Sequence, residues 1–207
     1  MAGEFLFTIG MSSQLEEAIQ GRFIKGRHEA RVVFVGRSNV GKSSLINTLL
    51  GARLAQVSKE PGKTKALHFY FDCDSELIFS DMPGYGFAKA KPEDQKRWSN
   101  LINEYLKYDQ HNIARALILL DARHGPTKID LEAIEYLQMG RIPVTFIMTK
   151  EDALKNQKEK SARQKEVKEA LEKIGYDFKD VFWVSSDQNH RGIKNLKSFL
   201  EKLKRNA

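Results

Sequence analysis

The sequence has 207 residues, a length that predicts one domain, or one domain with short extensions. Hydrophobic residues make up 41% and charged residues 29% of the chain, which argues against global disorder, a collagen-like repeat or a disulfide scaffold. No run approaches the roughly 18 uninterrupted apolar residues of a membrane-spanning helix, so no membrane partner is expected.

Net charge and cysteine content bear on the expected partner and cellular location but do not decide either. The chain carries 34 Lys and Arg against 27 Asp and Glu, a net charge of +7 that is compatible with a nucleic-acid partner or with solubility alone. Cys73 is the only cysteine, so no intramolecular disulfide can form, which fits a reducing, cytoplasmic location. The N-terminus lacks a basic region followed by a long apolar core and is a poor secretory signal.

Strand-like and helix-like patterns alternate along the chain. Residues 1–28 have weak periodicity and are expected to form an N-terminal extension with one short helix near 13–20, whereas residues 29–207 are expected to form the domain. Short apolar runs predict strands at 31–35, 67–71, 77–80, 116–120, 144–148 and 181–184. Apolar residues spaced by three and four predict helices within 45–50, 98–106, 131–137, 167–174 and 193–203.

This alternation predicts an α/β domain of three layers. Its sheet should be mixed, mainly parallel and six-stranded, with helices on both faces. Ligands of such sheets bind at the carboxyl ends of the strands.

The strongest motif runs from Gly36 to Ser43 and has the form G-x-x-x-x-G-K-S, between a predicted strand and a predicted helix, as a P-loop requires. Gly36 and Gly41 let the backbone approach phosphates closely, and the following helix presents its positive end to them. Lys42 supplies a cation to the β- and γ-phosphates, and the Ser43 hydroxyl can ligate Mg²⁺. The predicted contacts in this segment are Gly36, Arg37, Ser38, Asn39, Val40, Gly41, Lys42, Ser43 and Ser44.

Two further segments are placed to meet the γ-phosphate and the metal. Asp81 follows a predicted strand and can hold a Mg²⁺-bound water, while the N–H of Gly84 can meet the γ-phosphate. Thr64 lies in a loop where it can ligate Mg²⁺ and sense the γ-phosphate. Lys42, Thr64 and Gly84 are therefore the candidate catalytic residues. The flanking candidates for nucleotide contact are Gly62, Lys63, Lys65, Met82 and Pro83.

Thr149-Lys-Glu-Asp152 follows the predicted strand at 144–148 and matches the N/T-K-x-D base-recognition motif. The Asp152 carboxylate can accept hydrogen bonds from guanine N1–H and the exocyclic amine, whereas adenine presents an acceptor at N1. The Lys150 stem can lie along the base, and Glu151 completes the motif. Threonine at 149, where asparagine is commoner, puts one side-chain amide contact in doubt. Val184-Ser185-Ser186 follows the last strand, where backbone N–H groups can close over the base.

Taken together, Gly36–Asn47, Pro61–Thr64, Asp81–Ala88, Asp121–Thr127 and Thr149–Asp152 resemble the EngB (YihA/YsxC) family of bacterial GTPases over about residues 29 to 205. The resemblance implies a single Ras-like G domain, of the TrmE-Era-EngA-EngB-like superfamily, that binds GTP or GDP with Mg²⁺ at Ser43, Thr64 and Asp81. It also implies a role in large (50S) ribosomal subunit assembly, links to cell division and septation, and the subunit precursor and its rRNA as partners. A monomer is expected.

Hydrolysis is expected to be slow. Many GTPases carry a water-orienting glutamine after D-x-x-G, but Tyr85 stands here, and no arginine is clearly placed as a finger in cis. A ribosomal precursor or an added cation should raise the rate. The Asn39 side chain matches the position used by potassium-dependent relatives, so K⁺ could supply the fixed positive charge.

Two other function classes stay open. A P-loop phosphotransferase acting on a small molecule would bind ATP and leave the 149–152 motif unexplained. A nucleotide-binding scaffold without significant turnover is favoured by Tyr85. Candidate RNA contacts are the basic segment His190–Ala207 and the group Arg22, Lys25, Arg27 and Arg31.

Overall fold

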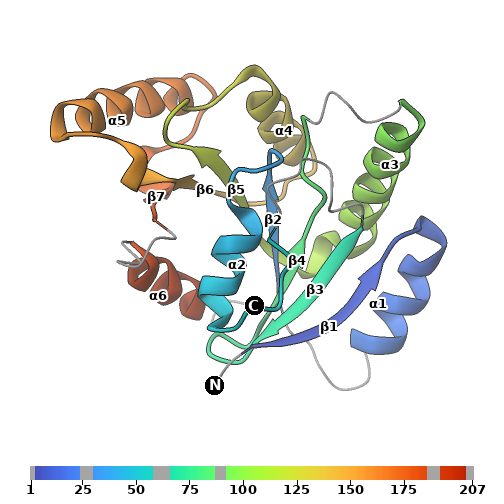
Figure 1. The fold of residues 1–207 in the computed structure, drawn as a ribbon. Coiled ribbons are helices and arrows are strands. Elements are labelled where there is room, and N and C mark those ends of the chain that lie inside the picture. The colour runs from blue at the N-terminus through green and yellow to red at the C-terminus, as the bar shows by residue number, and fades with distance from the viewer. Residues whose placement is uncertain (1–2, 24–29, 58–65, 87–91, 186–191, 204–207) are drawn as a thin grey trace.

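The computed structural model describes residues 3–23, 30–57, 66–86, 92–185 and 192–203 (Figure 1). Its sheet has seven strands in the order β1-β3-β4-β2-β5-β6-β7. Strand β3 is antiparallel to both β1 and β4, and every other neighbouring pair is parallel. The strands are β1 (Glu4–Ile9), β2 (Arg31–Gly36), β3 (Leu67–Asp72), β4 (Leu77–Asp81), β5 (Ile113–Asp121), β6 (Val144–Thr149) and β7 (Val181–Trp183).

Helices cover both faces of the sheet, which confirms the three-layer prediction. They are α1 (Leu15–Phe23), α2 (Lys42–Leu50), α3 (Pro92–Asp109), α4 (Lys128–Met139), α5 (Gln157–Glu172) and α6 (Ile193–Leu203). Buried side chains of α1, α3, α4 and α5 form one core cluster, and those of α2 and α6 form the other, on the face toward the viewer in Figure 1. Neighbours in β2 alternate between the clusters: Val33 packs into the first and Phe34 into the second.

The predicted strand number of six is wrong, because β1 adds a seventh strand at the edge, inside the segment expected to be an extension. Phe7 and Ile9 are buried on the sheet, but Phe5 is half exposed, and the register shifts between Phe5 and Phe7. This irregularity interrupts the period-two pattern by which a strand is recognised. The short helix expected near 13–20 is present as α1 after a 3₁₀ turn at Ser12–Gln14.

Arg31 was a candidate contact with RNA, and this prediction is wrong because the side chain is buried. Its side chain is 3% exposed, and its Nε lies 3.1 Å from a carboxylate oxygen of the fully buried Asp109 at the end of α3. Arg31 therefore joins β2 to α3 inside the molecule. Arg22, Lys25 and Arg27 lie outside the residues whose side chains are described.

The parallel strands end along one edge of the sheet, at the top of Figure 1. Gly36, Asp81, Asp121 and Thr149 close β2, β4, β5 and β6 at this edge. Helix starts are fixed there by local hydrogen bonds, as in the capping box of α4, where Asp130 accepts from the backbone N–H of Thr127 at 2.9 Å. Among the described helices, none is both long enough and apolar enough to cross a membrane.

Candidate functional site

The P-loop is a tight turn between β2 and α2, in the strand–loop–helix setting predicted from the sequence. A Cβ on Gly36 would lie 2.9 Å from Val40 Cγ1 and 3.0 Å from the Leu119 carbonyl oxygen, so only glycine fits. Gly41 has φ +105°, which favours glycine again. The N–H of Val40 donates to the Arg37 carbonyl at 3.2 Å and closes a turn, after which Gly41 leads into α2 at Lys42.

The structure brings Lys42, the first residue of α2, together with Asp81, the last residue of β4. The Lys42 ammonium forms an ion pair with the Asp81 carboxylate, and both side chains are buried. The first turn of α2 is thereby tied to the end of β4. Ser43 is half-buried beside Lys42.

The D-x-x-G segment lies directly against the P-loop. The Ser38 N–H donates to the Tyr85 carbonyl at 3.1 Å, and the Tyr85 N–H donates to the Gly36 carbonyl at 3.2 Å. A Cβ on Gly84 would lie 2.9 Å from the Ser38 nitrogen, so this approach requires glycine. The side chain of Met82, a predicted nucleotide contact, packs into the core instead, and its N–H donates to the Phe34 carbonyl at 3.2 Å. Parallel pairing of β4 with β2 thus continues past the end of both strands.

The side chain of Tyr85 points toward the start of α4. Its hydroxyl donates to the Asp130 carboxylate at 2.8 Å, and Asp130 is 1% exposed. Burial and the neighbouring Asp130 charge raise the pKa of the Tyr85 phenol well above its ordinary value. The phenol therefore stays protonated and hydrogen-bonded to Asp130 of α4.

The base-recognition motif is bonded to the P-loop. The Thr149 hydroxyl lies 2.6 Å from the Val40 carbonyl oxygen, to which it donates. Lys150 Nζ donates to the Asn39 carbonyl at 2.7 Å and to the Asp121 carboxylate at 2.8 Å. Threonine at 149 thus uses its hydroxyl to connect β6 to the phosphate loop.

Asp152 is held by the side chain of Ser185, a residue predicted to contribute only its backbone N–H. The Ser185 hydroxyl donates to the Asp152 carboxylate at 2.6 Å, and Ser185 is buried whereas Asp152 is exposed. Glu151 pairs with Lys160 of α5 at 3.0 Å. The remaining predicted contacts, Gly62, Lys63, Thr64, Lys65 and Ser186, lie outside the described residues.

Asp121 is a buried residue of the site with no role predicted from the sequence. Arg123 donates to it from Nε at 2.9 Å and from Nη2 at 2.7 Å, and Lys150 adds a third bond. Burial opposes the charge of the carboxylate, but the hydrogen bonds from Arg123 and Lys150 outweigh it and hold the pKa of Asp121 well below its usual range. Its position was the one available sequence signal, because Asp121 directly follows the predicted strand 116–120 at the same edge of the sheet.

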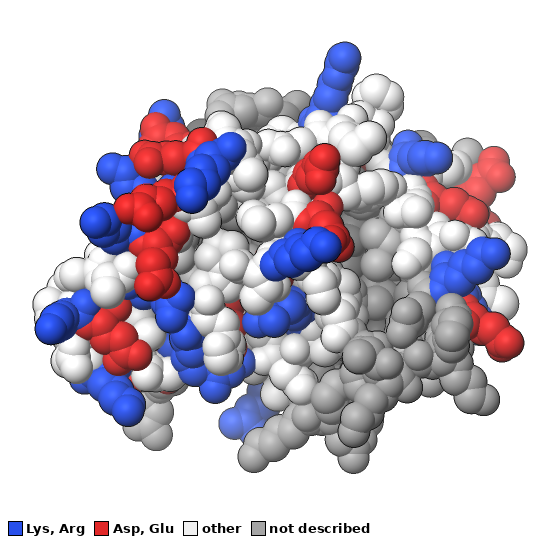
Figure 2. Space-filling view, turned by 90° about the horizontal axis from the view of Figure 1, so that it is seen from above, with Lys and Arg blue, Asp and Glu red and all other residues white. Residues whose placement is uncertain are grey.

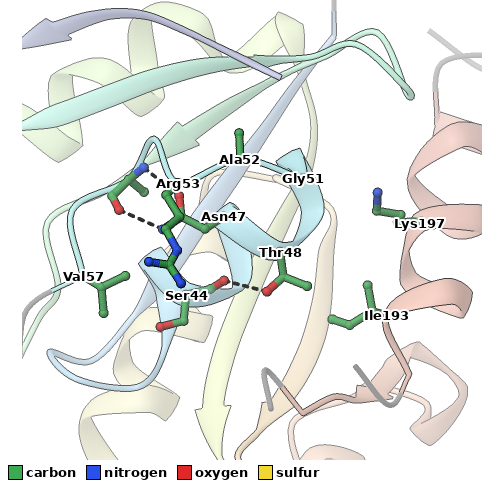
Figure 3. A pocket seen from close by; sticks show the side chains of 10 residues that line it. Ser44, Asn47, Thr48, Gly51, Ala52, Arg53, Val57, Ile193 and Lys197 are labelled. Carbon is green, nitrogen blue, oxygen red and sulfur yellow. Dashed lines mark hydrogen bonds between the residues drawn. The ribbon is translucent and has the colours of Figure 1, made fainter. Parts of the chain in front are cut away.

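A groove of about 1030 Å³ opens between α2 and α6 beside this site (Figure 3). Ser44 and Thr48 of α2 face Ile193 and Lys197 of α6 across it. Ser44 is the one predicted nucleotide contact among its described lining residues. The described residues contain no group of three His, Cys, Asp or Glu side chains that could hold a metal. The proposed Mg²⁺ ligands fit the ion by chemistry, because Ser43, which follows Lys42 in α2, and Asp81, which pairs with Lys42, both offer hard oxygen donors.

A mainly parallel sheet with G-x-x-x-x-G-K-S, D-x-x-G and T-K-x-D at its carboxyl edge defines a P-loop GTPase. The family model described as "50S ribosome-binding GTPase" matches residues 31–150. The probable GTP-binding protein EngB of Streptococcus agalactiae is 39% identical over 194 residues, which are 93% of this chain and 94% of that protein. Its counterpart in Aquifex aeolicus is 39% identical over 168 residues, 81% of this chain and 87% of that protein. The chain belongs to the EngB family of GTP-binding proteins.

Solved structures agree with this assignment. The crystal structure of a probable GTP-binding protein engB superposes with a TM-score of 0.65 at 28% identity and covers 86% of this chain and 100% of that one. Aquifex aeolicus Era bound to GDP.AlF4⁻ superposes with a TM-score of 0.69 at 21% identity, over 84% of this chain and 56% of that one. At that identity the likeness to Era shows the fold alone.

Proposed function

We propose that this chain is a slowly hydrolysing GTP switch in the assembly of the large ribosomal subunit, and that normal cell division and septation depend on it for that reason. One observation carries the proposal: three nucleotide motifs, distant in sequence, are bonded to one another at a single edge of the sheet. Lys42 pairs with Asp81, Thr149 bonds to Val40, and Lys150 bonds to Asn39. The family's description as ribosome-binding supports the choice of partner.

Each motif then has a role in binding. The amides of the P-loop and the Lys42 ammonium hold the β- and γ-phosphates. Ser43, Thr64 and Asp81 would hold Mg²⁺, which neutralises phosphate charge when bound. Lys42 and Asp81 neutralise each other in this structure. When a nucleotide and its metal bind, Lys42 would pair with phosphate and Asp81 with the metal, so both keep a partner of opposite charge. Asp152, oriented by Ser185, selects guanine.

We expect slow turnover because the Tyr85 side chain is bonded to α4 and does not orient a water. Its hydroxyl is bonded to Asp130, and a phenol cannot orient the attacking water as a glutamine amide does. A bound large-subunit precursor, or K⁺ held near the phosphates by the Asn39 side chain, would supply the missing stabilisation. Phosphate release by the purified chain should therefore be slow, faster with large-subunit particles, and faster in KCl than in NaCl. Equal rates in the two salts would remove the potassium part of the proposal.

Exchanging Asp152 for Asn tests the guanine assignment. Asparagine offers an amide donor where aspartate offers only acceptors, so Asp152→Asn should lose affinity for GDP and gain affinity for xanthosine diphosphate, whose C2 oxygen accepts. Titration with fluorescent GDP, XDP and ADP measures the change. An unchanged preference, or tighter binding of ADP than of GDP by the unaltered chain, would contradict the proposal and favour a phosphotransferase.

Co-sedimentation tests the partner. The chain should pellet with large ribosomal subunit precursors more strongly with a non-hydrolysable GTP analogue than with GDP. Exposed lysines on the basic helix α6, including Lys194 and Lys202, are candidate contacts with rRNA, and the chain is proposed to act as a monomer. Binding that ignores the nucleotide would argue against a switch, and no turnover in any condition would favour a scaffold.

A further inference from the structure

Asp130, the third residue of α4, lies where three segments of the molecule meet. Its carboxylate accepts from the hydroxyl of Tyr85, which follows the D-x-x-G motif, and it lies 3.7 Å from the Nε of Arg37 in the P-loop. Figure 2 looks down on this edge of the sheet, where acidic side chains reach the surface, but Asp130 is only 1% exposed. Protein groups rather than solvent therefore surround its carboxylate.

The pairing of the sheet explains why side chains from two segments reach one carboxylate. Arg37 and Tyr85 are partners in a parallel bridge that continues the pairing of β2 with β4 beyond their ends. Val33 and Val35 of β2 pack into the core cluster that contains the buried apolar residues of α4, and alternation places Arg37 on that same face. Tyr85 also packs against this cluster. Both side chains therefore project toward the face on which α4 lies.

The two oxygens of the Asp130 carboxylate have different partners. Oδ2 accepts from the Thr127 N–H at 2.9 Å and from the Thr127 hydroxyl at 2.6 Å, and so closes the capping box of α4. Oδ1 accepts from the Tyr85 hydroxyl at 2.8 Å. One oxygen thus stabilises the start of the helix, and the other holds the tyrosine. Helix capping alone requires only the first.

The bond to Tyr85 restrains the backbone beside it. The Tyr85 carbonyl accepts from the Ser38 N–H at 3.1 Å. Gly84, directly before Tyr85, approaches Ser38 so closely that a Cβ on it would lie 2.9 Å from the Ser38 nitrogen. The N–H of Gly84 is the group proposed to meet the γ-phosphate. Anchoring the Tyr85 side chain therefore limits the movement of an amide that would distinguish GTP from GDP.

We propose that Asp130 is a positioning residue: through Tyr85 it holds the D-x-x-G segment against the P-loop before a nucleotide binds, so that the Gly84 N–H is already placed for the γ-phosphate. The inference rests on the proposed function, which supplies the γ-phosphate. A contact that is ordered in advance does not have to be ordered on binding, which lowers the cost of binding GTP. GDP has no γ-phosphate and gains nothing from this arrangement.

Three single substitutions separate positioning from helix capping. Tyr85→Phe removes the hydroxyl that donates to Oδ1. Asp130→Asn keeps one oxygen, which can still accept from the Thr127 N–H, but it places an amide donor where Tyr85 needs an acceptor and removes the charge beside Arg37. Thr127→Ala removes the hydroxyl bonded to Oδ2 and leaves the Tyr85 bond in place, so it is the matched control. All three should lower the melting temperature, because each removes a hydrogen bond.

Amide hydrogen exchange of the nucleotide-free chain tests the position of the segment. The Ser38 N–H is protected by its bond to the Tyr85 carbonyl. Its exchange, followed by NMR, should become about fivefold faster in Tyr85→Phe and Asp130→Asn and should match the parent in Thr127→Ala. Equal exchange of this amide in the parent and the three variants overturns the proposal.

Nucleotide titration tests the consequence for binding. Fluorescent GDP and a fluorescent non-hydrolysable GTP analogue are titrated separately, both with Mg²⁺. Tyr85→Phe and Asp130→Asn should bind the GTP analogue about fivefold more weakly and GDP with unchanged affinity. Thr127→Ala should keep both affinities although its melting temperature falls. A loss shared equally by the two nucleotides would reveal a general structural defect, and tighter binding of the GTP analogue would show that the bond opposes the GTP-bound state. Either result overturns the proposal.

These measurements also separate the inference from the proposed function. If the parent chain binds neither guanosine nucleotide, the proposed function fails and the positioning role fails with it. If the parent binds both, and Tyr85→Phe and Asp130→Asn keep its ratio of GDP to GTP-analogue affinity, the proposed function stands and the positioning role alone fails.

Discussion

At the scale of single residues, Ser185 decides how well the guanine-reading carboxylate is placed. Its hydroxyl donates to Asp152 at 2.6 Å, and a hydrogen bond to a charged group is worth about 1.5–3 kcal/mol. Because Asp152 is exposed, we expect Ser185→Ala to weaken GDP binding by about tenfold, roughly 1.4 kcal/mol. Fluorescent GDP titration measures this. Ser185→Thr, which keeps the hydroxyl, should bind GDP as the parent does, and Ser161→Ala on the exposed face of α5 should not change the affinity. Unchanged GDP affinity of Ser185→Ala would refute the role.

Asp121 makes stability depend on pH. The hydrogen bonds from Arg123 and Lys150 lower its pKa in the folded chain, against about 3.9 when unfolded. Its stabilisation is therefore present above the unfolded pKa and is lost as pH falls toward the folded pKa. Asp121→Asn should cost about 1–2 kcal/mol at pH 7. In urea unfolding the cost should shrink near pH 3, whereas Glu132→Gln, on an exposed face, should show little effect at either pH. A cost independent of pH would contradict this.

At the scale of secondary-structure elements, the buried pair Arg31–Asp109 joins β2 to α3. Burial raises the pKa of Asp109 more than the Arg31 charge lowers it, so the carboxylate depends on its partner. Removing one partner of a buried pair costs about 3–5 kcal/mol, and we expect this loss for Arg31→Met. The double variant Arg31→Met with Asp109→Leu should recover most of the loss in urea unfolding. Equal stability of the single variant and the parent would show that the pair does not hold the elements together.

The elements near the site were largely predictable, whereas the contacts between their loops were not. Apolar runs ending at Gly36 and before Asp81 and Thr149 predict strands, and parallel strands bring their ends to one edge. The bonds from Tyr85 to Asp130 and from Ser185 to Asp152 join residues 45 and 33 positions apart, which no local pattern encodes. Strand β1 escaped prediction because its irregular register hides the alternation.

At the scale of the whole molecule, β1 completes the sheet by covering the edge of β3. Phe7 is 7% exposed and stacks on Phe69 with ring centroids 4.7 Å apart, whereas Phe5 on the same strand is 49% exposed. A buried phenylalanine truncated in a core costs about 3–5 kcal/mol, so Phe7→Ser should destabilise the chain by about that much. Phe5→Ser should cost less than about 1 kcal/mol, which makes it the matched control.

The same comparison tests whether β1 belongs to the cooperative fold. If β1 unfolds together with the sheet, Phe7→Ser lowers the midpoint of the thermal transition followed by the signals of the buried tyrosines Tyr70 and Tyr105. It should also promote aggregation on heating, because an uncovered β3 would expose unpaired N–H and C=O groups along its edge. If Phe7→Ser and Phe5→Ser melt at the same temperature, β1 contributes nothing to global stability, and the sheet is held by the six strands from β3 to β7 alone.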